Sequence, residues 1–269
     1  MKLLDGKVAI ITGSGRGIGA ATARLFAQHG ARVVISDIDP QPAQETAHAI
    51  SQSGGDVMVV TGDLTDPTFP EHLVQGTLDQ WGALDILVNN AGYTWDAVIH
   101  KMSDPQWEAM LAIHLTAPFH LIRAAATYLR ERAKQEGSAV ARKIVNVSST
   151  TGTRGNAGQA NYAAGKAGII GLTKTLSKEW GRFNIQVNAV AFGMIESRLT
   201  QAKEQGETTM RGEEEIALGI PDNMRQIAQL MIPLGRPGTP EEAAGPILFF
   251  ASPLSDYVSG QVLEVTGGF

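Results

Sequence analysis

The chain has 269 residues, which suits one large α/β domain or two small ones, and its 43% hydrophobic and 18% charged residues are typical of a globular protein. A net charge of −5 argues against nucleic acid and anionic membranes as partners, and the absence of cysteine excludes disulfides, thiolate metal sites and cysteine nucleophiles. The N-terminus carries no signal-peptide pattern and no apolar run approaches the length of a membrane span, so we expect a cytoplasmic protein.

Short β-branched runs alternate with helical segments along most of the chain. Strands are expected at residues 7–12, 32–36, 57–61, 84–89, 143–148, 185–190 and 261–265, and helices at 20–29, 42–53, 71–81, 104–132, 161–181 and 240–251. Alternation at this spacing is typical of βαβ units, which place a parallel sheet between two layers of helices. We therefore predict a single-domain α/β fold, a Rossmann-type doubly wound parallel sheet of about seven strands.

A glycine-rich turn separates the first expected strand from the first expected helix. It reads Thr-Gly-Ser-Gly-Arg-Gly-Ile-Gly from Thr12 to Gly19. Glycines in this position let backbone amides and a helix N-terminus approach a pyrophosphate. Glycines also serve tight turns, so the turn alone is a weak signal. Its place between the first strand and the first helix favours a dinucleotide site.

A tyrosine and a lysine stand four residues apart at the start of the helix expected at 161–181. Positions four apart share one helix face, so the phenol of Tyr162 and the ammonium of Lys166 can point at the same spot. A neighbouring cation favours the phenolate, and this pair therefore predicts a lowered pKa for Tyr162 and a role as acid or base. A chance pairing on an exposed helix is the alternative.

Taken together, these motifs resemble the short-chain dehydrogenase/reductase family over essentially the whole chain. The motifs are Gly13, Gly17 and Gly19, Asn89–Gly92 after the fourth strand, Tyr162 with Lys166, and Asn156–Gly168 and Pro233–Gly238, which resemble the 3-oxoacyl-carrier-protein reductase-like branch. The resemblance implies an NAD(P)-binding oxidoreductase that interconverts a ketone and a secondary alcohol by hydride transfer, with a 3-oxoacyl thioester reductase as one candidate. A polyol, steroid or other small-alcohol dehydrogenase, and a dinucleotide-sensing binding protein without turnover, stay open.

The resemblance also implies which residues are catalytic. Ser149, 13 residues before Tyr162, would hydrogen-bond the substrate oxygen, and Tyr162 would transfer the proton. Lys166 would hold the nicotinamide ribose. Where the family has an asparagine, this chain has His114, which either relays protons in its place or only packs.

The cofactor site is likewise implied by the resemblance. Its residues would be Gly13, Arg16, Gly17, Ile18, Gly19, Asp37, Asp63, Leu64, Asn90, Gly92, Tyr162, Lys166, Gly193, Ile195 and Ser197, with no metal. Asp37 ends the second strand, where a carboxylate binds an adenosine ribose and repels a 2′-phosphate. Arg16 points the other way, because a basic residue there resembles NADP-preferring members. We weigh Asp37 more heavily, since a close charge repulsion discriminates strongly, and predict NAD over NADP.

Residues 193–235 show neither pattern clearly and are predicted to form a substrate-binding lid. They contain four of the eight methionines, a residue that lines adaptable apolar surfaces. An ordered insertion that serves oligomer packing is the alternative. We expect a small apolar carbonyl or alcohol as substrate and no nucleic acid or membrane as partner. The family resemblance and the many small residues at 163–171 favour a homotetramer.

Overall fold

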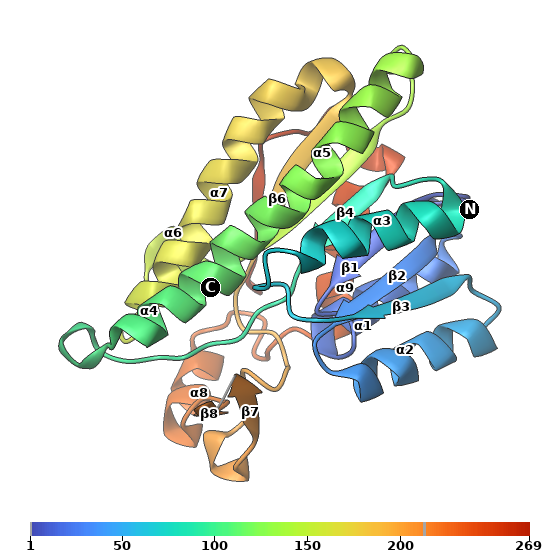
Figure 1. Cartoon of the computed structure of the whole chain (residues 1–269). Coiled ribbons are helices and arrows are strands. Elements are labelled where there is room, and N and C mark those ends of the chain that lie inside the picture. The colour runs from blue at the N-terminus through green and yellow to red at the C-terminus, as the bar shows by residue number, and fades with distance from the viewer. Residues whose placement is uncertain (1, 212–213) are drawn as a thin grey trace.

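Seven parallel strands form the central sheet of the computed structural model, which describes residues 2–211 and 214–269 (Figure 1). They are β1 (Val8–Thr12), β2 (Arg32–Asp37), β3 (Val57–Thr61), β4 (Ile86–Asn89), β5 (Arg142–Ser149), β6 (Ile185–Phe192) and β9 (Val262–Val265), in the order β3-β2-β1-β4-β5-β6-β9. The strand order reverses between β1 and β4, which opens a crevice at the carboxyl ends of the strands. The predicted α/β fold with a Rossmann-type sheet is confirmed.

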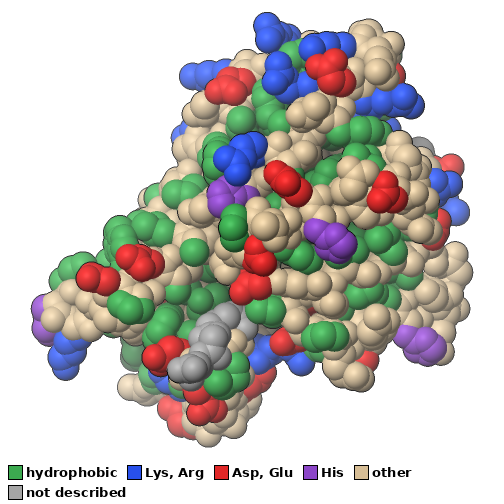
Figure 2. Space-filling model, in the orientation of Figure 1, with side chains coloured by type: hydrophobic (Ala, Val, Ile, Leu, Met, Phe, Trp, Pro, Cys, Tyr) green, Lys and Arg blue, Asp and Glu red, His purple; other side chains and the backbone are tan. Residues whose placement is uncertain are grey.

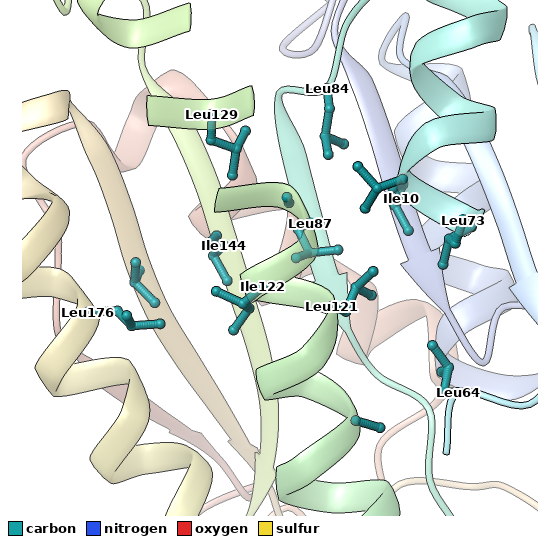
Figure 3. Close-up of a cluster of buried hydrophobic side chains, with 14 of the residues drawn as sticks. Ile10, Leu64, Leu73, Leu84, Leu87, Leu121, Ile122, Leu129, Ile144 and Leu176 are labelled. Carbon is teal, nitrogen blue, oxygen red and sulfur yellow. The ribbon is translucent and has the colours of Figure 1, made fainter. Parts of the chain in front are cut away.

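Helices cover both faces of this sheet (Figure 1). The helices α1 (Gly17–Gln28), α2 (Pro40–Gln52) and α9 (Pro240–Ala251) lie on one face, and α3 (Phe69–Trp81), α4 (Asp104–Leu111), α5 (Ala117–Gln135) and α7 (Ala160–Trp180) lie on the other. Side chains alternate between the two faces along each strand. In β1, Ile10 joins the cluster under α3, α5 and α7, whereas Ala9 and Ile11 join the cluster under α1 and α9. Figure 3 shows Ile10 with Leu87 and Leu121 in the first cluster.

The helix predicted at 104–132 is interrupted. It consists of α4, a π-helical turn at Ala112–Thr116, and α5, which runs on to Gln135. A π turn inserts one extra residue per hydrogen-bonded ring, and such turns are frequent at functional sites. His114 lies in the middle of this one. An 18-residue stretch within Asp104–Gln135 is also apolar enough to cross a membrane by length and composition, contrary to the sequence expectation. However, Leu121 and Leu129 are buried against the sheet, as in a core helix.

The segment at 193–235 has more regular structure than its sequence suggests. It contains a hairpin of β7 (Thr208–Arg211) and β8 (Glu214–Ala217), followed by the helix α8 (Asp222–Leu230). The hairpin is anchored because Ile216 belongs to the buried cluster under α3, α5 and α7. The short alternating strands were missed since two four-residue runs give almost no periodic signal. The helix α6 (Thr150–Arg154), which is only five residues long, was missed for the same reason.

Candidate active site

One cleft runs across the carboxyl ends of the strands and beneath the segment at 193–235. Its volume is about 840 Å³, which is large enough for a dinucleotide and a small substrate. Every residue that the sequence proposed for catalysis or cofactor binding lines this cleft. They are Gly13, Arg16, Gly17, Ile18, Gly19, Asp37, Asp63, Leu64, Asn90, Gly92, His114, Ser149, Tyr162, Lys166, Gly193, Ile195 and Ser197.

The glycine turn is held against the end of β4 by hydrogen bonds from the Asn90 side chain. The Nδ2 of Asn90 donates to the carbonyls of Thr12, at 2.9 Å, and of Gly13, at 3.1 Å. Gly13 and Gly17 have φ angles of +62° and +53°, which favour glycine. A Cβ on Gly19 would lie 2.2 Å from the carbonyl oxygen of Gly13. The turn therefore needs these glycines to bring its backbone close to a ligand at the N-terminus of α1.

Asp37 and Arg16 both line the cleft beside the glycine turn. The Oδ2 of Asp37 accepts a 2.8 Å hydrogen bond from the backbone N–H of Gly15, and its Oδ1 accepts one of 3.1 Å from Asp39. Arg16 does not extend alone into the cleft. Its Nη1 lies 2.8 Å from the Oδ2 of Asp39, a residue that was not proposed from the sequence. The Arg16–Asp39 ion pair forms because the fold brings the end of β2 next to the glycine turn.

Asp63 and Leu64 flank the same end of the cleft. The Oδ1 of Asp63 accepts hydrogen bonds of 2.8 Å and 2.7 Å from the backbone and hydroxyl of Thr65, so it shapes the turn after β3. Leu64 is buried in the hydrophobic cluster under α3, α5 and α7. At the opposite end, Gly193 donates to the carbonyl of Val265 at 3.0 Å, which ties the end of β6 to β9.

Ile195 and Ser197 begin the lid segment. Ile195 is buried and forms an isolated bridge with Gly238. The hydroxyl of Thr200 donates to the Ile195 carbonyl at 2.5 Å, and the backbone N–H of Ser197 donates to that same hydroxyl at 3.0 Å. These bonds hold the first turn of the lid beside the cleft.

Ser149 and Tyr162 are hydrogen-bonded to each other in the cleft. Ser149 ends β5 and caps α6, where its Oγ accepts a 3.1 Å hydrogen bond from the backbone N–H of Thr151. Tyr162 lies in the first turn of α7. Burial raises the pKa of Tyr162 to about 12, although its hydrogen bond with Ser149 opposes that shift. The phenol is therefore protonated at neutral pH and is able to donate a proton.

Lys166 does not act on Tyr162 as the sequence predicted. Its Nζ donates a 2.7 Å hydrogen bond to the carbonyl of Val147 and lies 5.7 Å from the centre of the Tyr162 ring. Burial lowers the pKa of Lys166 to about 7. Removal from water penalises the charged form of both side chains, and for Tyr162 this desolvation outweighs the interactions that favour a phenolate. The expectation of a lowered tyrosine pKa is wrong for this arrangement.

His114 packs between Gly92, in the loop after β4, and Gly165 of α7. Its Nε2 lies 2.7 Å from the carbonyl oxygen of Tyr93, and its ring meets the Tyr162 ring edge-on at 4.8 Å. A Cβ on Gly92 would lie 2.3 Å from the imidazole. Burial lowers the pKa of His114 well below its usual range, and the nearby Lys166 lowers it further. The imidazole is neutral, and its Nε2–H donates to a carbonyl that cannot pass a proton on.

Two polar residues at the substrate end were missed by sequence reasoning. The Nε2 of Gln159 donates a 2.8 Å hydrogen bond to the Oδ2 of Asp96, and both residues line the cleft. Burial raises the pKa of Asp96, while Gln159 and the lid residue Lys203 lower it. Both lie in loops without periodicity, so only their nearness to Tyr162 identifies them.

The lid contributes mostly apolar side chains to the cleft. Among its methionines, Met194 and Met224 line the cleft, and Met231 is 56% exposed. Leu218 and Ile220 line the cleft from the loop between β8 and α8. Within residues 2–211 and 214–269, no group of three acidic or histidine side chains could hold a metal ion.

The sequence matches the profile of the short chain dehydrogenase family over residues 7–208. It is 40% identical over 265 residues to a 3-oxoacyl-[acyl-carrier-protein] reductase of Thermotoga maritima, with 98% of each chain covered. It is 40% identical over 267 residues to the enzyme of the same name from Chlamydia muridarum, with 99% and 98% covered. A solved structure described as an NAD(P)-dependent gluconate 5-dehydrogenase from Beutenbergia cavernae, with NADP bound at low occupancy, superposes with a TM-score of 0.85. That protein is 32% identical, with 98% of this chain and 97% of the other covered.

Proposed function

The chain belongs to the short-chain dehydrogenase family, and on that premise we propose that it is an NAD(H)-dependent oxidoreductase that interconverts a ketone and a secondary alcohol, with a 3-oxoacyl thioester as the preferred substrate class. One observation carries the proposal: Ser149, Tyr162 and Lys166 line one cleft together with a glycine turn in which an added Cβ at Gly13 or Gly19 would clash with neighbouring backbone. The named 3-oxoacyl reductases among its relatives support the substrate class.

The cofactor end of the cleft suits a dinucleotide. Gly13, Gly17 and Gly19 keep the backbone bare at the N-terminus of α1, where a pyrophosphate is stabilised by amides and the helix dipole. When bound, the nicotinamide would supply or accept the hydride. Asp37 would face the adenosine ribose, and Asn90 would hold the turn in place through its bonds to Thr12 and Gly13.

At the reaction centre, the protein groups would bind and protonate the substrate oxygen. The Ser149 hydroxyl would donate a hydrogen bond to the carbonyl oxygen, and the protonated Tyr162 would deliver the proton as the alcohol forms. Lys166 has a pKa of about 7, so a ribose hydroxyl beside its Nζ would find it part charged at neutral pH. We propose His114 as a positioning residue, which holds the ring plane of Tyr162 and ties the π turn to Tyr93.

The lid at 193–235 would close over an apolar acyl chain. Leu218, Ile220 and Met224 line the cleft from this segment. On the face seen in Figure 2, Lys and Arg side chains gather at the end of α5, at the opposite end of the molecule from the lid. On this face, an acidic carrier protein would therefore find the gathered basic side chains at the end of α5 and away from the lid. This favours a small thioester over a carrier-bound one as the test substrate.

A second candidate is a sugar-acid or polyol dehydrogenase. Asp96 and Gln159 place a carboxylate and an amide beside Tyr162, and such groups bind hydroxyls. The gluconate 5-dehydrogenase fold relative agrees with this alternative. It differs from the first candidate in needing polar contacts along the whole substrate.

A turnover panel with purified protein tests the proposal. NADH oxidation is followed with a 3-oxobutanoyl thioester, a keto-sugar acid and a plain methyl ketone. We expect the thioester to give the highest kcat/KM. Preference for the keto-sugar acid would replace the first candidate with the second, and NADH binding without turnover on any ketone would support a dinucleotide sensor.

A further inference from the structure

Arg16 and Asp39 form an ion pair inside the adenosine end of the cleft. The Nη1 of Arg16 lies 2.8 Å from the Oδ2 of Asp39, and the two side chains are 47% and 44% exposed. Both residues line the cleft together with Asp37 and Asp63. This end of the cleft therefore sets one cation against three carboxylates, and the cation is already paired.

The local structure explains why Asp39 is available for this pair. Asp39 is the N-cap residue of α2, a position where a carboxylate usually accepts a hydrogen bond from the second or third backbone N–H of the helix. The third helical residue is Pro42, which has no N–H, so of these two donors only Gln41 is left. In the described structure, the Asp39 side chain makes no such capping bond. Its carboxylate turns instead across the cleft edge to Arg16.

Asp37 cannot take over this role. Its Oδ2 is occupied by the backbone N–H of Gly15 and its Oδ1 by that of Asp39. A Cβ on Gly15 would lie 2.9 Å from that Oδ2, so the carboxylate is held tightly against the turn. The two acidic residues thus differ: Asp37 is fixed by backbone amides, whereas Asp39 is held mainly by one exposed and breakable ion pair.

We infer that Asp39 is a coenzyme-specificity residue that acts by occupying Arg16. A guanidinium in this turn is suited to bind a 2′-phosphate in a two-pronged contact, but here that fork already faces a carboxylate. NADP would have to break the Arg16–Asp39 pair and also bring its 2′-phosphate close to the negative charge of Asp37. NAD carries a 2′-hydroxyl and needs neither change. The inference rests on the proposed function only in assuming that the cleft binds a nicotinamide dinucleotide.

The test is coenzyme binding without substrate. Dissociation constants of NADH and NADPH are measured by fluorescence titration for the wild type, Asp39→Asn and Glu45→Gln, at low and high salt. Glu45 is an exposed acid on α2 outside the cleft, so Glu45→Gln removes the same charge without touching Arg16. We expect Asp39→Asn to tighten NADPH about tenfold at low salt and to leave NADH within about twofold. The gain should shrink at high salt, because the groups are exposed.

The double variant Arg16→Ala/Asp39→Asn separates release of Arg16 from simple loss of negative charge. If Asp39 acts through Arg16, the gain from Asp39→Asn falls to about threefold or less when Arg16 is absent. An equal gain in both backgrounds, or an equal gain from Glu45→Gln, would overturn the inference. So would unchanged NADPH binding in Asp39→Asn while NADH binds normally, and that result would leave the proposed function standing. Failure of every variant to bind either dinucleotide would overturn both.

Discussion

The two ends of the cleft are built in different ways. At the nucleotide end, backbone meets backbone: a Cβ on Gly19 would lie 2.2 Å from the Gly13 carbonyl. At the catalytic end, side chains from separate elements converge, with Ser149 at the end of β5, Tyr162 on α7 and His114 in a π turn. The nucleotide end requires glycines because a side chain would clash with neighbouring backbone. The catalytic end depends on the burial and hydrogen bonding of its side chains. Substitutions should therefore impair binding and stability at one end and turnover at the other.

The largest effect is expected at the catalytic end. Tyr162→Phe removes the proposed proton donor and should lower kcat by about 10²–10⁴-fold, while NADH binding stays within a few-fold. Steady-state kinetics and fluorescence titration measure the two quantities. Tyr128→Phe is the matched control, since the Tyr128 hydroxyl donates to the Gly82 carbonyl outside the cleft. Full activity of Tyr162→Phe would refute the assignment of the acid.

The burial of Lys166 predicts a pH-dependent stability. Its pKa is about 7 in the folded protein against 10.5 as its ordinary value, so the unfolded chain binds more protons between those values. The free energy of unfolding should therefore rise with pH across this window, by up to about 1.4 kcal/mol per pH unit relative to Lys166→Met. Above pH 10 the raised pKa of Tyr162 works in the opposite direction, because the unfolded phenol ionises first.

Chemical denaturation of the wild type and Lys166→Met at pH 6, 7.5 and 9 measures this difference. Below pH 7 both states of the wild type are protonated, so the two curves should run parallel there. A difference between the proteins that is constant from pH 6 to pH 9 would show that Lys166 keeps an ordinary pKa.

At the nucleotide end, Gly19→Ala should lose stability and NADH affinity together. The added methyl group meets the backbone of Gly13 and the side chain of Asn90, so we expect about 1–3 kcal/mol of destabilisation and weaker NADH binding. Gly76→Ala is the opposite case. It lies within α3, where an added Cβ meets no described atom within 4 Å, and it should stabilise the fold by about 0.5–1 kcal/mol. Normal NADH binding by a stable Gly19→Ala protein would contradict the contrast between the ends.

Substitution of His114 tests whether turnover depends on more than Ser149, Tyr162 and Lys166. His114→Ala removes both the bond to the Tyr93 carbonyl and the edge contact with Tyr162, and should lower kcat about tenfold with little change in NADH affinity. His114→Asn retains a donor and should recover part of the loss. NMR of the imidazole should show a neutral ring from pH 6 to pH 8. Titration near 6.5 would instead favour the proton relay.

The smallest effect belongs to the lid. Met224 lines the cleft and is 57% exposed, so Met224→Ala should raise KM for an apolar ketone about two- to fivefold and leave kcat unchanged. Leu230→Ala serves as control, because Leu230 is 86% exposed and lies outside the cleft. Equal KM values for the two variants would argue against a substrate role for the lid.

By itself, the sequence determined the fold class, the glycine turn and most of the residues to which a role in the cleft is given, but not Asp39, Asp96 or Gln159. Strand and helix periodicity is carried within short windows, and Gly13 and Gly17 are needed for φ angles that other residues rarely adopt. The position of Ser149 followed from a resemblance of motifs. These features depend on neighbours in the chain, which is why they could be predicted.

Only the tertiary structure decided how the gathered groups behave. Burial raised the pKa of Tyr162 and lowered that of Lys166, which reverses the effect expected from their spacing. Arg16 forms an ion pair with Asp39, 23 positions along the chain, and the His114 imidazole forms a hydrogen bond with the carbonyl of Tyr93. Desolvation and long-range pairing depend on which elements come together, and a sequence window of one helix or strand holds no information about either.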